Sequence, residues 1–378
     1  MKVAVTHPTA WPWVRRGSER LLNDFSQYLA GRGYAVTVIS SSPEGRSETM
    51  DGAVRKIFVR QRLSFLKGLR QLNGFHAFTF DCRDAVLRGD YDAVHCLNYH
   101  DAYGALLARR ASGRHFRIVY QMTGIPVARY FRSIPIDRLM FRRVVRECDA
   151  VICLSRFALD CLRRDFGREG LLIPSPTAVG PFEAQPRRLR EPRMILFSGD
   201  ADEPRKGALL LARAFPRIVE GAGALQLHFA GRCSPATQAA ILAGMPQALR
   251  DKIVFHGIGK VDDLPPLYAS AAVVVNPAIW EALGNVLIEA LAAGAPVVGA
   301  NHAGIPDIID SPRVGALFEP GSTVGAANNV DGLVAAVLAA LELSGRPETA
   351  DLCRERARDF EWEKLGPRYE AALREVPA

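Results

Sequence analysis

Residues 272–299 read AVVVNPAIWEALGNVLIEALAAGAPVVG, and this stretch outlines a strand, a turn, a helix and a second strand. The apolar run 272–275 is rich in valine, as expected of a strand that is buried on both faces. Gly284 is expected to open a helix that Gly294 closes, and Pro296 then leads into the next strand. A unit of this kind predicts a parallel sheet covered by helices.

Short apolar runs alternate with longer helical periodicities along the whole chain. In the first half the sequence predicts strands at Val3–Thr6, Ala35–Ser40, Ala53–Val59, Ala93–Leu97, Arg117–Gln121, Ala150–Leu154 and Leu171–Ile173. In the second half it predicts strands at Met194–Phe197, Leu225–Ala230, Ile253–His256, Ala272–Val275, Pro296–Gly299 and Ala316–Phe318. Helices are expected between them, among others at Ser18–Ala30, Ile136–Glu147, Lys206–Glu220, Pro235–Leu249, Gly284–Ala293 and Val330–Leu343. This order of elements is typical of doubly wound α/β sheets.

The stretch Glu183–Arg193 interrupts this alternation, since it is charged, contains two prolines and has no apolar period. We interpret it as a linker between two domains. A chain of 378 residues is also longer than one ordinary core requires. The predicted fold class is therefore α/β, with two Rossmann-like, doubly wound domains in tandem.

The charge is unevenly distributed along the chain. Residues 1–190 carry 31 Lys+Arg against 17 Asp+Glu, a net of +14, and residues 191–378 carry 17 against 23, a net of −6, which together give the +8 of the sequence. The basic half suggests an anionic membrane surface, an anionic substrate or nucleic acid as a partner, and an arginine-rich proteome is the alternative explanation. Because we find no helix-turn-helix, RNP or zinc signature, we predict that no nucleic acid is bound.

Targeting and redox features point to the cytoplasm. The N-terminus lacks the basic and apolar regions of a signal peptide, and no apolar run approaches the ~20 residues of a membrane span. The seven cysteines include no CxxC pair, which predicts neither a disulfide framework nor a zinc site. Arg55–Phe80, where basic and large apolar residues are interleaved, is either a basic amphipathic helix at a membrane interface or a solvated helix beside a loop. The first case predicts a cytoplasmic protein peripheral to the inner face of the membrane.

Glu281 and Glu289 are the acidic residues of the quoted stretch. In an open α/β sheet, ligands bind at the carboxyl ends of the strands, where Glu281 lies in a turn. The helix that starts at Gly284 offers free backbone N–H groups and the positive end of its dipole, which suit a phosphate or sugar hydroxyls. Glu289, about a turn and a half into that helix, is suited to accept hydrogen bonds from the ribose hydroxyls of a nucleotide.

The stretch resembles the E-x7-E region of glycosyltransferase family 4, which has the GT-B fold of two Rossmann-like domains with a cleft between them. The positions that match the family pattern are Glu281, Gly284, Glu289, Ala290, Gly294, Pro296, Val297, Val298, Gly304, Pro306 and Asp307. The resemblance implies that Glu281 contacts the donor sugar near the reacting carbon and that Glu289 holds the ribose. It also implies donor contacts at the turn and helix start, formed by Leu283, Gly284, Asn285 and Val286.

Residues 197–207, which read FSGDADEPRKG, resemble the G-R-…-K-G element of the same family. Lys206 matches the lysine that neutralises the donor diphosphate, which gains negative charge as the glycosidic bond breaks. Asp200 stands where the family has an arginine, and Arg205 is expected to replace that arginine. The pair Asp200 and Asp202 is interpreted as loop polarity, with a metal-binding pair as the alternative.

A weaker resemblance covers the first half of the chain. Gly17, in the stretch RGSER, matches a glycine that lets the backbone approach the diphosphate. Thr123 and Gly124 stand where the family often has a histidine and a glycine after a strand, so both are candidate contacts of the sugar or the acceptor. His100 is a candidate to compensate for the missing histidine, and an ordinary packing role is the alternative.

The resemblance also implies which substrate each half of the chain binds. Residues 1–185 are expected to bind the acceptor and residues 193–360 to bind the donor, with base contacts near Gly257 and Ile258. Trp362 belongs to a motif that resembles the closing helix of the family, so a helix at about 361–378 is expected to pack back on the first domain.

The family implies a retaining glycosyltransferase that moves a sugar from a nucleotide diphosphate donor to a hydroxyl acceptor. The resemblance implies a reaction in which the leaving phosphate helps to deprotonate the acceptor, so no protein nucleophile is required. No metal or other cofactor is expected, because GT-B enzymes typically work without a bound divalent metal and the sequence shows no His/Cys ligand cluster. The acceptor is a cell-envelope lipid or polysaccharide precursor, or a natural-product scaffold, and the residues leave this choice open. One alternative is a nucleotide-sugar epimerase-like GT-B protein. The other is a non-catalytic GT-B binding subunit, and such a subunit would be expected to lose Glu281 or Lys206.

Overall fold

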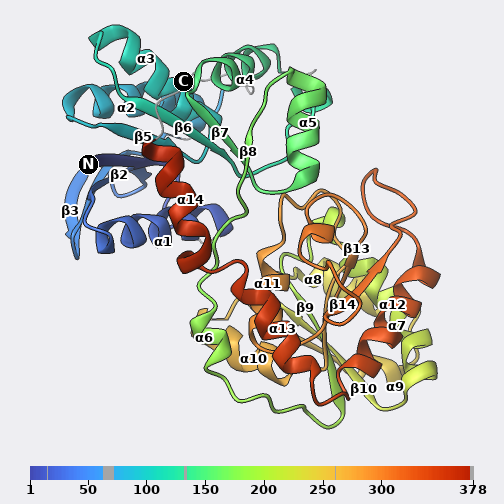
Figure 1. Cartoon of the computed structure of the whole chain (residues 1–378). Helices are drawn as coiled ribbons and strands as arrows, with labels where there is room; N and C mark the ends of the chain where they lie inside the picture. The colour runs from blue at the N-terminus through green and yellow to red at the C-terminus, as the bar shows by residue number, and fades with distance from the viewer. Residues whose placement is uncertain (15, 63–71, 132–133, 260, 375–378) are drawn as a thin grey trace. The chain divides into compact units, whose positions relative to one another are not determined.

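The computed structural model describes residues 1–14, 16–62, 72–131, 134–259 and 261–374. The chain forms two compact units, shown in Figure 1. Unit 1 contains Met1–Pro176 and the residues from Leu365 onward, and unit 2 contains Thr177–Lys364. The chain thus leaves unit 1 after Pro176 and returns to it near its end.

The sheet of unit 1 has the strand order β3-β4-β2-β1-β5-β6-β7-β8. Its strands are β1 (Lys2–Thr6), β2 (Ala35–Ser42), β3 (Ser47–Asp51), β4 (Val54–Arg60), β5 (Ala93–Cys96), β6 (Arg117–Met122), β7 (Ala150–Cys153) and β8 (Leu171–Leu172). Strand β3 is antiparallel to β4, and the other pairs are parallel. Numbered along the chain, the parallel strands begin 3-2-1-4-5-6, which is the order of a doubly wound dinucleotide-binding sheet.

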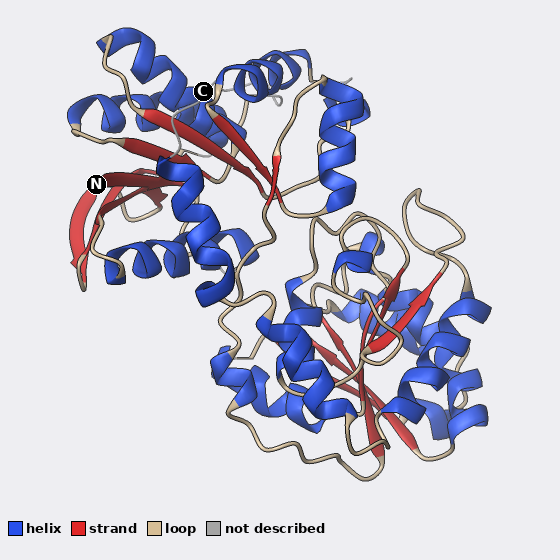
Figure 2. Ribbon diagram, in the orientation of Figure 1, coloured by secondary structure: helices blue, strands red, loops and turns tan. Residues whose placement is uncertain are grey.

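Helices cover both faces of this sheet (Figure 2). They are α1 (Gly17–Gly31), α2 (Gly74–Arg88), α3 (Tyr99–Ser112), α4 (Pro135–Glu147), α5 (Arg156–Phe166) and α14 (Trp362–Arg374), with a 3-10 turn at Ala128–Phe131. Phe78, Leu106 and Phe141, from α2, α3 and α4, share one core. On α1 and α14, Phe25 and Tyr369 pack with their ring centroids 5.4 Å apart.

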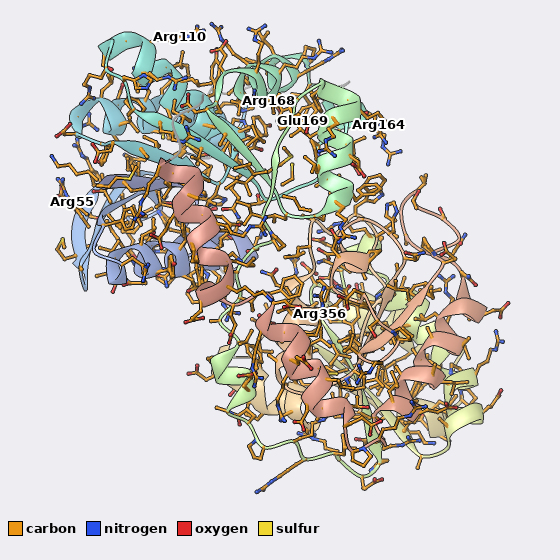
Figure 3. All side chains as sticks on the ribbon, in the orientation of Figure 1. Arg55, Arg110, Arg164, Arg168, Glu169 and Arg356 are labelled. Atoms are coloured by element: carbon orange, nitrogen blue, oxygen red, sulfur yellow. The ribbon has the colours of Figure 1, made fainter. Side chains whose placement is uncertain are left out.

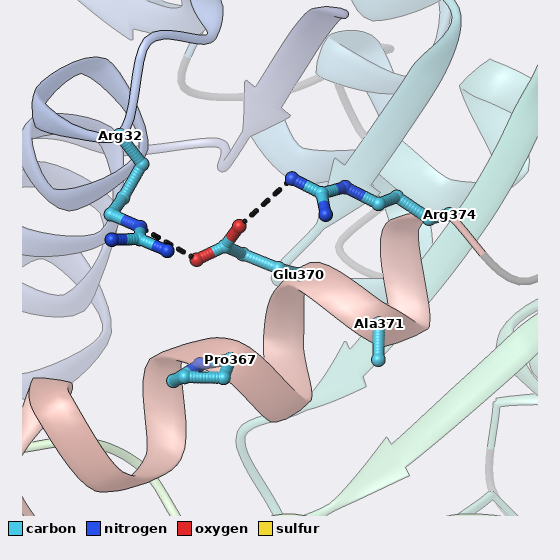
Figure 4. Close-up of a pocket in the computed structure, with 5 residues that line it drawn as sticks. All are labelled: Arg32, Pro367, Glu370, Ala371 and Arg374. Atoms are coloured by element: carbon cyan, nitrogen blue, oxygen red, sulfur yellow. Dashed lines mark hydrogen bonds and ion pairs between the residues drawn. The ribbon is translucent and has the colours of Figure 1, made fainter.

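Helix α14 is held on unit 1 by a buried carboxylate. The carboxylate of Glu370 accepts hydrogen bonds from the hydroxyls of Tyr28 (2.8 Å) and Tyr34 (2.9 Å). Arg32 and Arg374 contact it from either side, at 3.1 and 3.0 Å (Figure 4). Four donors on one carboxylate explain why the pKa of Glu370 lies below its usual value although burial opposes ionisation.

The sheet of unit 2 is parallel and has the order β11-β10-β9-β12-β13-β14, which is 3-2-1-4-5-6 along the chain. Its strands are β9 (Arg193–Ser198), β10 (Leu225–Ala230), β11 (Ile253–Gly257), β12 (Val273–Asn276), β13 (Val297–Ala300) and β14 (Gly315–Phe318). Its helices are α6 (Gly180–Glu183), α7 (Ala208–Ala222), α8 (Pro235–Leu242), α9 (Gln247–Arg250), α10 (Leu264–Ser270), α11 (Asn285–Ala292), α12 (Val330–Leu343) and α13 (Thr349–Arg358). Helices α7 and α12 pack together, as do α11 and α13 (Figure 1).

Every predicted strand is present, and the predicted fold class is confirmed for each unit. Strand β3 was not predicted, because its five residues are all exposed and carry no apolar pattern. The predicted helix Pro235–Leu249 is wrong as one element, since the chain turns at Gly244 (φ +73°) and Pro246 between α8 and α9.

Two predicted segments differ in the structure. Arg55–Phe80 is not one amphipathic helix, because residues up to Arg60 lie in β4 and α2 begins only at Gly74; residues 63–71 lie outside the described residues. The stretch Glu183–Arg193 belongs to unit 2, where the Arg187 guanidinium donates to the Ala269 carbonyl oxygen at 2.9 Å. The stretch is therefore bound to the end of α10 by the Arg187 side chain and by the N–H groups of Arg188 and Arg190, so it is not a free linker.

Two further findings concern the membrane and the thiols. Within the described ranges, none of the helices combines the length and the apolar composition that crossing a membrane requires. All seven cysteines are free thiols, and all but Cys233 are buried.

Candidate functional site

The strand order places two charged loops of unit 2 next to each other. Strands β9 and β12 are neighbours, and the order of the sheet reverses between them. In a doubly wound sheet, ligands bind at the carboxyl ends of the strands at this point. Lys206 follows β9 and Glu281 follows β12, so both predicted residues lie at the switch point.

Lys206 and Glu281 form an ion pair between the Lys206 Nζ and the Glu281 Oε1. Arg205 lies beside them, with its Nη1 3.8 Å from the same oxygen and its Nη2 2.7 Å from Glu203 Oε2. The side chains of Lys206 and Glu281 are 22% and 14% exposed, so the pair remains open to an incoming ligand. A diphosphate bound here would contact the cationic side chains of Lys206 and Arg205. The Glu281 carboxylate would then lose its contact with Lys206 and could bind another group.

Backbone contacts hold the two loops together. The Ile279 N–H donates to the Arg205 carbonyl oxygen at 2.9 Å. Gly207 has φ +77°, and a Cβ on it would lie 2.8 Å from the Pro277 carbonyl oxygen. Only glycine permits this approach without strain. The position of Lys206 therefore depends on the residue that follows it.

A third loop, after β13, supports Glu281 from its other side. The Gly304 N–H donates to the Glu281 carbonyl oxygen at 2.9 Å, and a Cβ on Gly304 would clash with the Ala282 backbone. Trp280, in the left-handed region at φ +61°, donates from Nε1 to the Thr323 carbonyl oxygen at 2.7 Å. A strained non-glycine residue next to the ion pair is typical of a functional turn.

The helix after this turn presents the predicted donor-binding residues. Gly284 has φ +112° and precedes α11 without a side-chain cap, so the first N–H groups of α11 have no capping side chain. Leu283 is buried, and Asn285 and Val286 are half-buried at this helix start. Glu289 is buried, and its Oε2 accepts a hydrogen bond from the Tyr268 hydroxyl at 3.3 Å. Uncapped N–H groups suit an anion.

The predicted base-binding residues end β11 at the same edge of the sheet. Gly257 has φ +69°, and Ile258 is 77% exposed. The preceding His256 contacts the Nδ1 of His228 through its Nε2 at 2.9 Å. Burial lowers the pKa of His228 to about 4, so both rings are neutral near pH 7. This neutral pair suits a nucleobase better than a phosphate.

Asp202, one of the paired aspartates of the β9 loop, is occupied by the start of α8. Its Oδ1 accepts hydrogen bonds from the Ser234 N–H (2.8 Å) and the Thr237 hydroxyl (2.6 Å). These hydrogen bonds lower the pKa of Asp202 to about 2. The role observed for Asp202 is the attachment of the β9 loop to α8.

The candidates of unit 1 have different surroundings. A Cβ on Gly17 or Gly124 would meet nothing within 4 Å, so the backbone is open to approach at both positions. The Thr123 hydroxyl donates to the Leu97 carbonyl oxygen at 3.3 Å. His100 is 2% exposed, with its Nε2 3.7 Å from the Asp137 Oδ1, so it lies inside unit 1 and is not open to a substrate.

Sequence reasoning missed several residues that shape these sites. Tyr268, Trp280 and Asn276 support the site of unit 2, and His76 and Asp137 surround His100. Asn276 ends the otherwise apolar strand β12, with its Oδ1 accepting from the Ala278 N–H at 3.3 Å. A buried amide in such a strand is the one signal that was visible in the sequence.

Two Rossmann-like units, with cations at the switch point of the second, define the GT-B class of protein. The solved sucrose-phosphate synthase of Thermosynechococcus elongatus has this fold, with a TM-score of 0.79 over 99% of this chain and 98% of that chain at 19% identity. Residues 15–177 match the family described as Glycosyltransferase Family 4, and residues 192–342 match Glycosyl transferases group 1. The chain belongs to glycosyltransferase family 4, so the predicted family is confirmed.

Curated relatives include lipid mannosyltransferases. The chain is 31% identical over 207 residues to the phosphatidyl-myo-inositol mannosyltransferase of Mycobacterium leprae, which covers 52% of this chain and 53% of that relative. It is 27% identical over 298 residues to the GDP-mannose-dependent alpha-(1-6)-phosphatidylinositol monomannoside mannosyltransferase of Mycolicibacterium smegmatis, covering 71% and 72%. The chain thus matches about half the length of the first of these relatives.

Proposed function

We propose that this protein is a retaining glycosyltransferase that moves a hexosyl group from a nucleoside diphosphate sugar to a hydroxyl of a lipid acceptor. The observation that carries the proposal is the ion pair of Lys206 and Glu281 at the switch point of unit 2. Family membership supports the reaction, and the lipid mannosyltransferases among the relatives support the substrate class.

In this mechanism, Lys206 and Arg205 neutralise the diphosphate while the start of α11 binds one of its phosphate groups. Lys206 exchanges Glu281 for the diphosphate, and Glu281 then positions the sugar. Glu289 accepts hydrogen bonds from the ribose. The sugar carbon loses its bond to the phosphate oxygen and gains one to the acceptor oxygen on the same face, while the acceptor proton passes to the leaving phosphate. No protein nucleophile and no metal at the donor site are needed for this step.

The acceptor half of the proposal rests on the surface of unit 1. Helix α4 exposes Ile136 (43%) and Leu139 (65%), and Arg138, Arg142 and Arg146 are exposed around them. Further basic residues, such as Arg110 and Arg164, lie on the outside of unit 1 in Figure 3. Apolar residues inside a basic surface suit the headgroup region of an anionic membrane. We therefore place the acceptor in such a membrane, with the protein bound peripherally.

The donor test is a binding and nucleotide-release assay with GDP-, UDP-, ADP- and dTDP-sugars, with GDP-mannose first because of the relative that depends on it. Lys206→Ala and Glu289→Ala should both lose binding of the preferred donor. Lys252→Ala is the matched control, because Lys252 precedes β11 and lies at the opposite, amino edge of the sheet. Equal binding by all variants would refute the assigned site, and product formed without an acceptor would indicate an epimerase instead.

The membrane test is co-sedimentation with vesicles of phosphatidylcholine alone or with phosphatidylinositol. Leu139→Glu should reduce binding to the anionic vesicles, and Leu209→Glu, at an exposed leucine of unit 2, should not. Equal sedimentation of the two variants would contradict a role for α4.

A further inference from the structure

Three helices of unit 1 begin at one point, and each contributes one side chain there. His76 is the third residue of α2, His100 the second of α3 and Asp137 the third of α4. All three are buried, with 4%, 2% and 6% exposure. One ligand atom from each lies within 4.8 Å of the others. The reaction proposed above makes no use of this cluster.

Two asparagines fix the orientation of the imidazole rings. The Asn98 Oδ1 accepts the backbone N–H of His100 and lies 3.0 Å from its Nδ1. The Asn73 Oδ1 accepts the Phe75 N–H and lies 3.1 Å from the Nδ1 of His76, and the Asn73 N–H donates to this Nδ1 at 3.3 Å. In each case the other ring nitrogen, Nε2, faces Asp137. An oxygen behind the distal nitrogen is the second-shell arrangement of metal-binding histidines.

His100 already has a lone pair directed into the cluster. Its Nδ1 must carry the proton, because the Asn98 Oδ1 can only accept and is oriented by the backbone N–H that it binds. The Nε2 is therefore unprotonated, and it has no hydrogen-bond partner among the described residues. A buried acceptor such as this nitrogen lowers the stability of the fold when no donor binds it. A bound ligand would satisfy it.

The distances fit a small ion. The Asp137 Oδ1 lies 2.7 Å from the His76 Nε2 and 3.7 Å from the His100 Nε2. A tetrahedral zinc ion with bonds of about 2.0–2.1 Å holds its ligand atoms about 3.3 Å apart. The two observed separations bracket this value. The asparagine caps satisfy N–H groups at two of the helix starts, and Asp137 supplies a negative charge against their dipoles.

We propose that His76, His100 and Asp137 bind a divalent transition-metal ion of the zinc class and leave one coordination position open. Two imidazoles and one carboxylate are ligands that suit zinc. Before binding, the His76 Nε2–H donates to Asp137 and its Nδ1 accepts the Asn73 N–H. On binding, the ring proton moves from Nε2 to Nδ1, which then donates to the Asn73 Oδ1, and the freed Nε2 binds the ion. The ion joins the starts of α2, α3 and α4, so its main effect is on the stability of unit 1. The sequence could not reveal this site, because His76 and Asp137 are 61 positions apart.

The first test measures metal on the intact protein. After purification without chelator, elemental analysis and titration with Co²⁺ should give one ion per chain, with visible absorption bands of a tetrahedral N/O site. Adding Zn²⁺ should remove the bands and raise the melting temperature above that of chelator-treated protein. Absence of binding to the chelator-treated protein at micromolar Zn²⁺ and Co²⁺ would overturn the proposal.

The second test uses variants. Asp137→Asn and His100→Gln should weaken Zn²⁺ binding by about a hundredfold or more, since even second-shell changes cost 10- to 100-fold. His95→Gln is the matched control, because His95 is an equally buried histidine of unit 1 bonded to Gln121 outside the cluster. Binding that all three variants retain would mean that the ion sits elsewhere and would overturn the proposal. Donor binding by Asp137→Asn should be unchanged, so this test is separate from that of the proposed reaction.

Discussion

The two sheets share one strand order, but their switch points carry different polar groups. At the switch point of unit 1, the carboxylate of Asp101 is fully buried and its Oδ2 accepts from the Thr6 hydroxyl at 2.6 Å. At that of unit 2, Glu281 is partly exposed and pairs with a lysine. Burial raises the pKa of the Asp101 carboxyl well above its usual value.

The comparison indicates which edge can respond to a charged ligand. The side chains of Lys206 and Arg205 are positively charged, and both can exchange their contact with Glu281 for a contact with a diphosphate. The hydroxyl of Thr6 cannot neutralise charge that develops on a leaving group. The framework is therefore common to both units, and the loop residues decide which unit carries a partly exposed ion pair at its switch point.

The largest effect is expected for Lys206→Ala. Loss of one preorganised group that stabilises developing charge typically lowers kcat by about 10²–10³-fold. Sugar transfer with the donor identified by the binding panel measures the effect, with Lys252→Ala as control. If Lys206→Ala retains more than a tenth of the sugar-transfer activity, the charged groups at the switch point of unit 2 do not have the role that separates it from the switch point of unit 1.

Gly207→Ala and Gly113→Ala form a pair that compares the units. Both glycines have positive φ, but a Cβ on Gly113 meets nothing within 4 Å, whereas one on Gly207 meets Pro277. Gly113→Ala should cost about 1 kcal/mol in the free energy of unfolding. Gly207→Ala should cost about 1–3 kcal/mol more because of the clash, and it should also lower donor affinity. Urea unfolding measures both, and equal losses would contradict the close approach of the two loops.

Glu370→Gln should destabilise unit 1 and leave the donor site intact. The change replaces the charge that accepts from Tyr28, Tyr34 and two arginines, at a cost of about 1.5–3 kcal/mol. Chemical unfolding should show this loss while donor binding at 25 °C stays unchanged. Glu363→Gln, on the exposed side of the same helix, is the control. Loss of donor affinity in folded Glu370→Gln would show that the units are not separable.

Both units should also share a dependence on pH. Burial lowers the pKa of His95 in unit 1 and of His228 in unit 2 to about 4. The unfolded chain binds these protons near pH 6.5 and the folded chain does not, so stability should fall as the pH decreases from about 6.5 to about 4. Thermal melts across this range measure the slope. His95→Gln should make it shallower, and an unchanged slope would assign the acid sensitivity to other groups.

Much of this structure could be predicted, because its strands are buried on both faces. Runs such as Val273–Asn276 have few interpretations other than a central parallel strand. The proximity of Lys206 and Glu281 could be predicted, since a parallel sheet brings the carboxyl ends of its strands to one edge. Strand β3 could not be predicted, because its residues are exposed and it forms only by pairing with β4. The cluster around His100 was also hidden, since only tertiary packing joins three helix starts.

Helix α14 has a consequence for the order in which this protein can be made. Unit 1 includes residues from Leu365 onward, and Tyr369 packs between Phe25 and Gln121 of its core. On the ribosome, the first unit to emerge is thus the last to be completed, since all of unit 2 must be synthesised before α14 appears. Until then the sheet of unit 1 exposes the apolar face that α14 covers. A chain shortened after unit 2 would retain that exposed face permanently, so synthesis and docking of α14 is the step that completes unit 1.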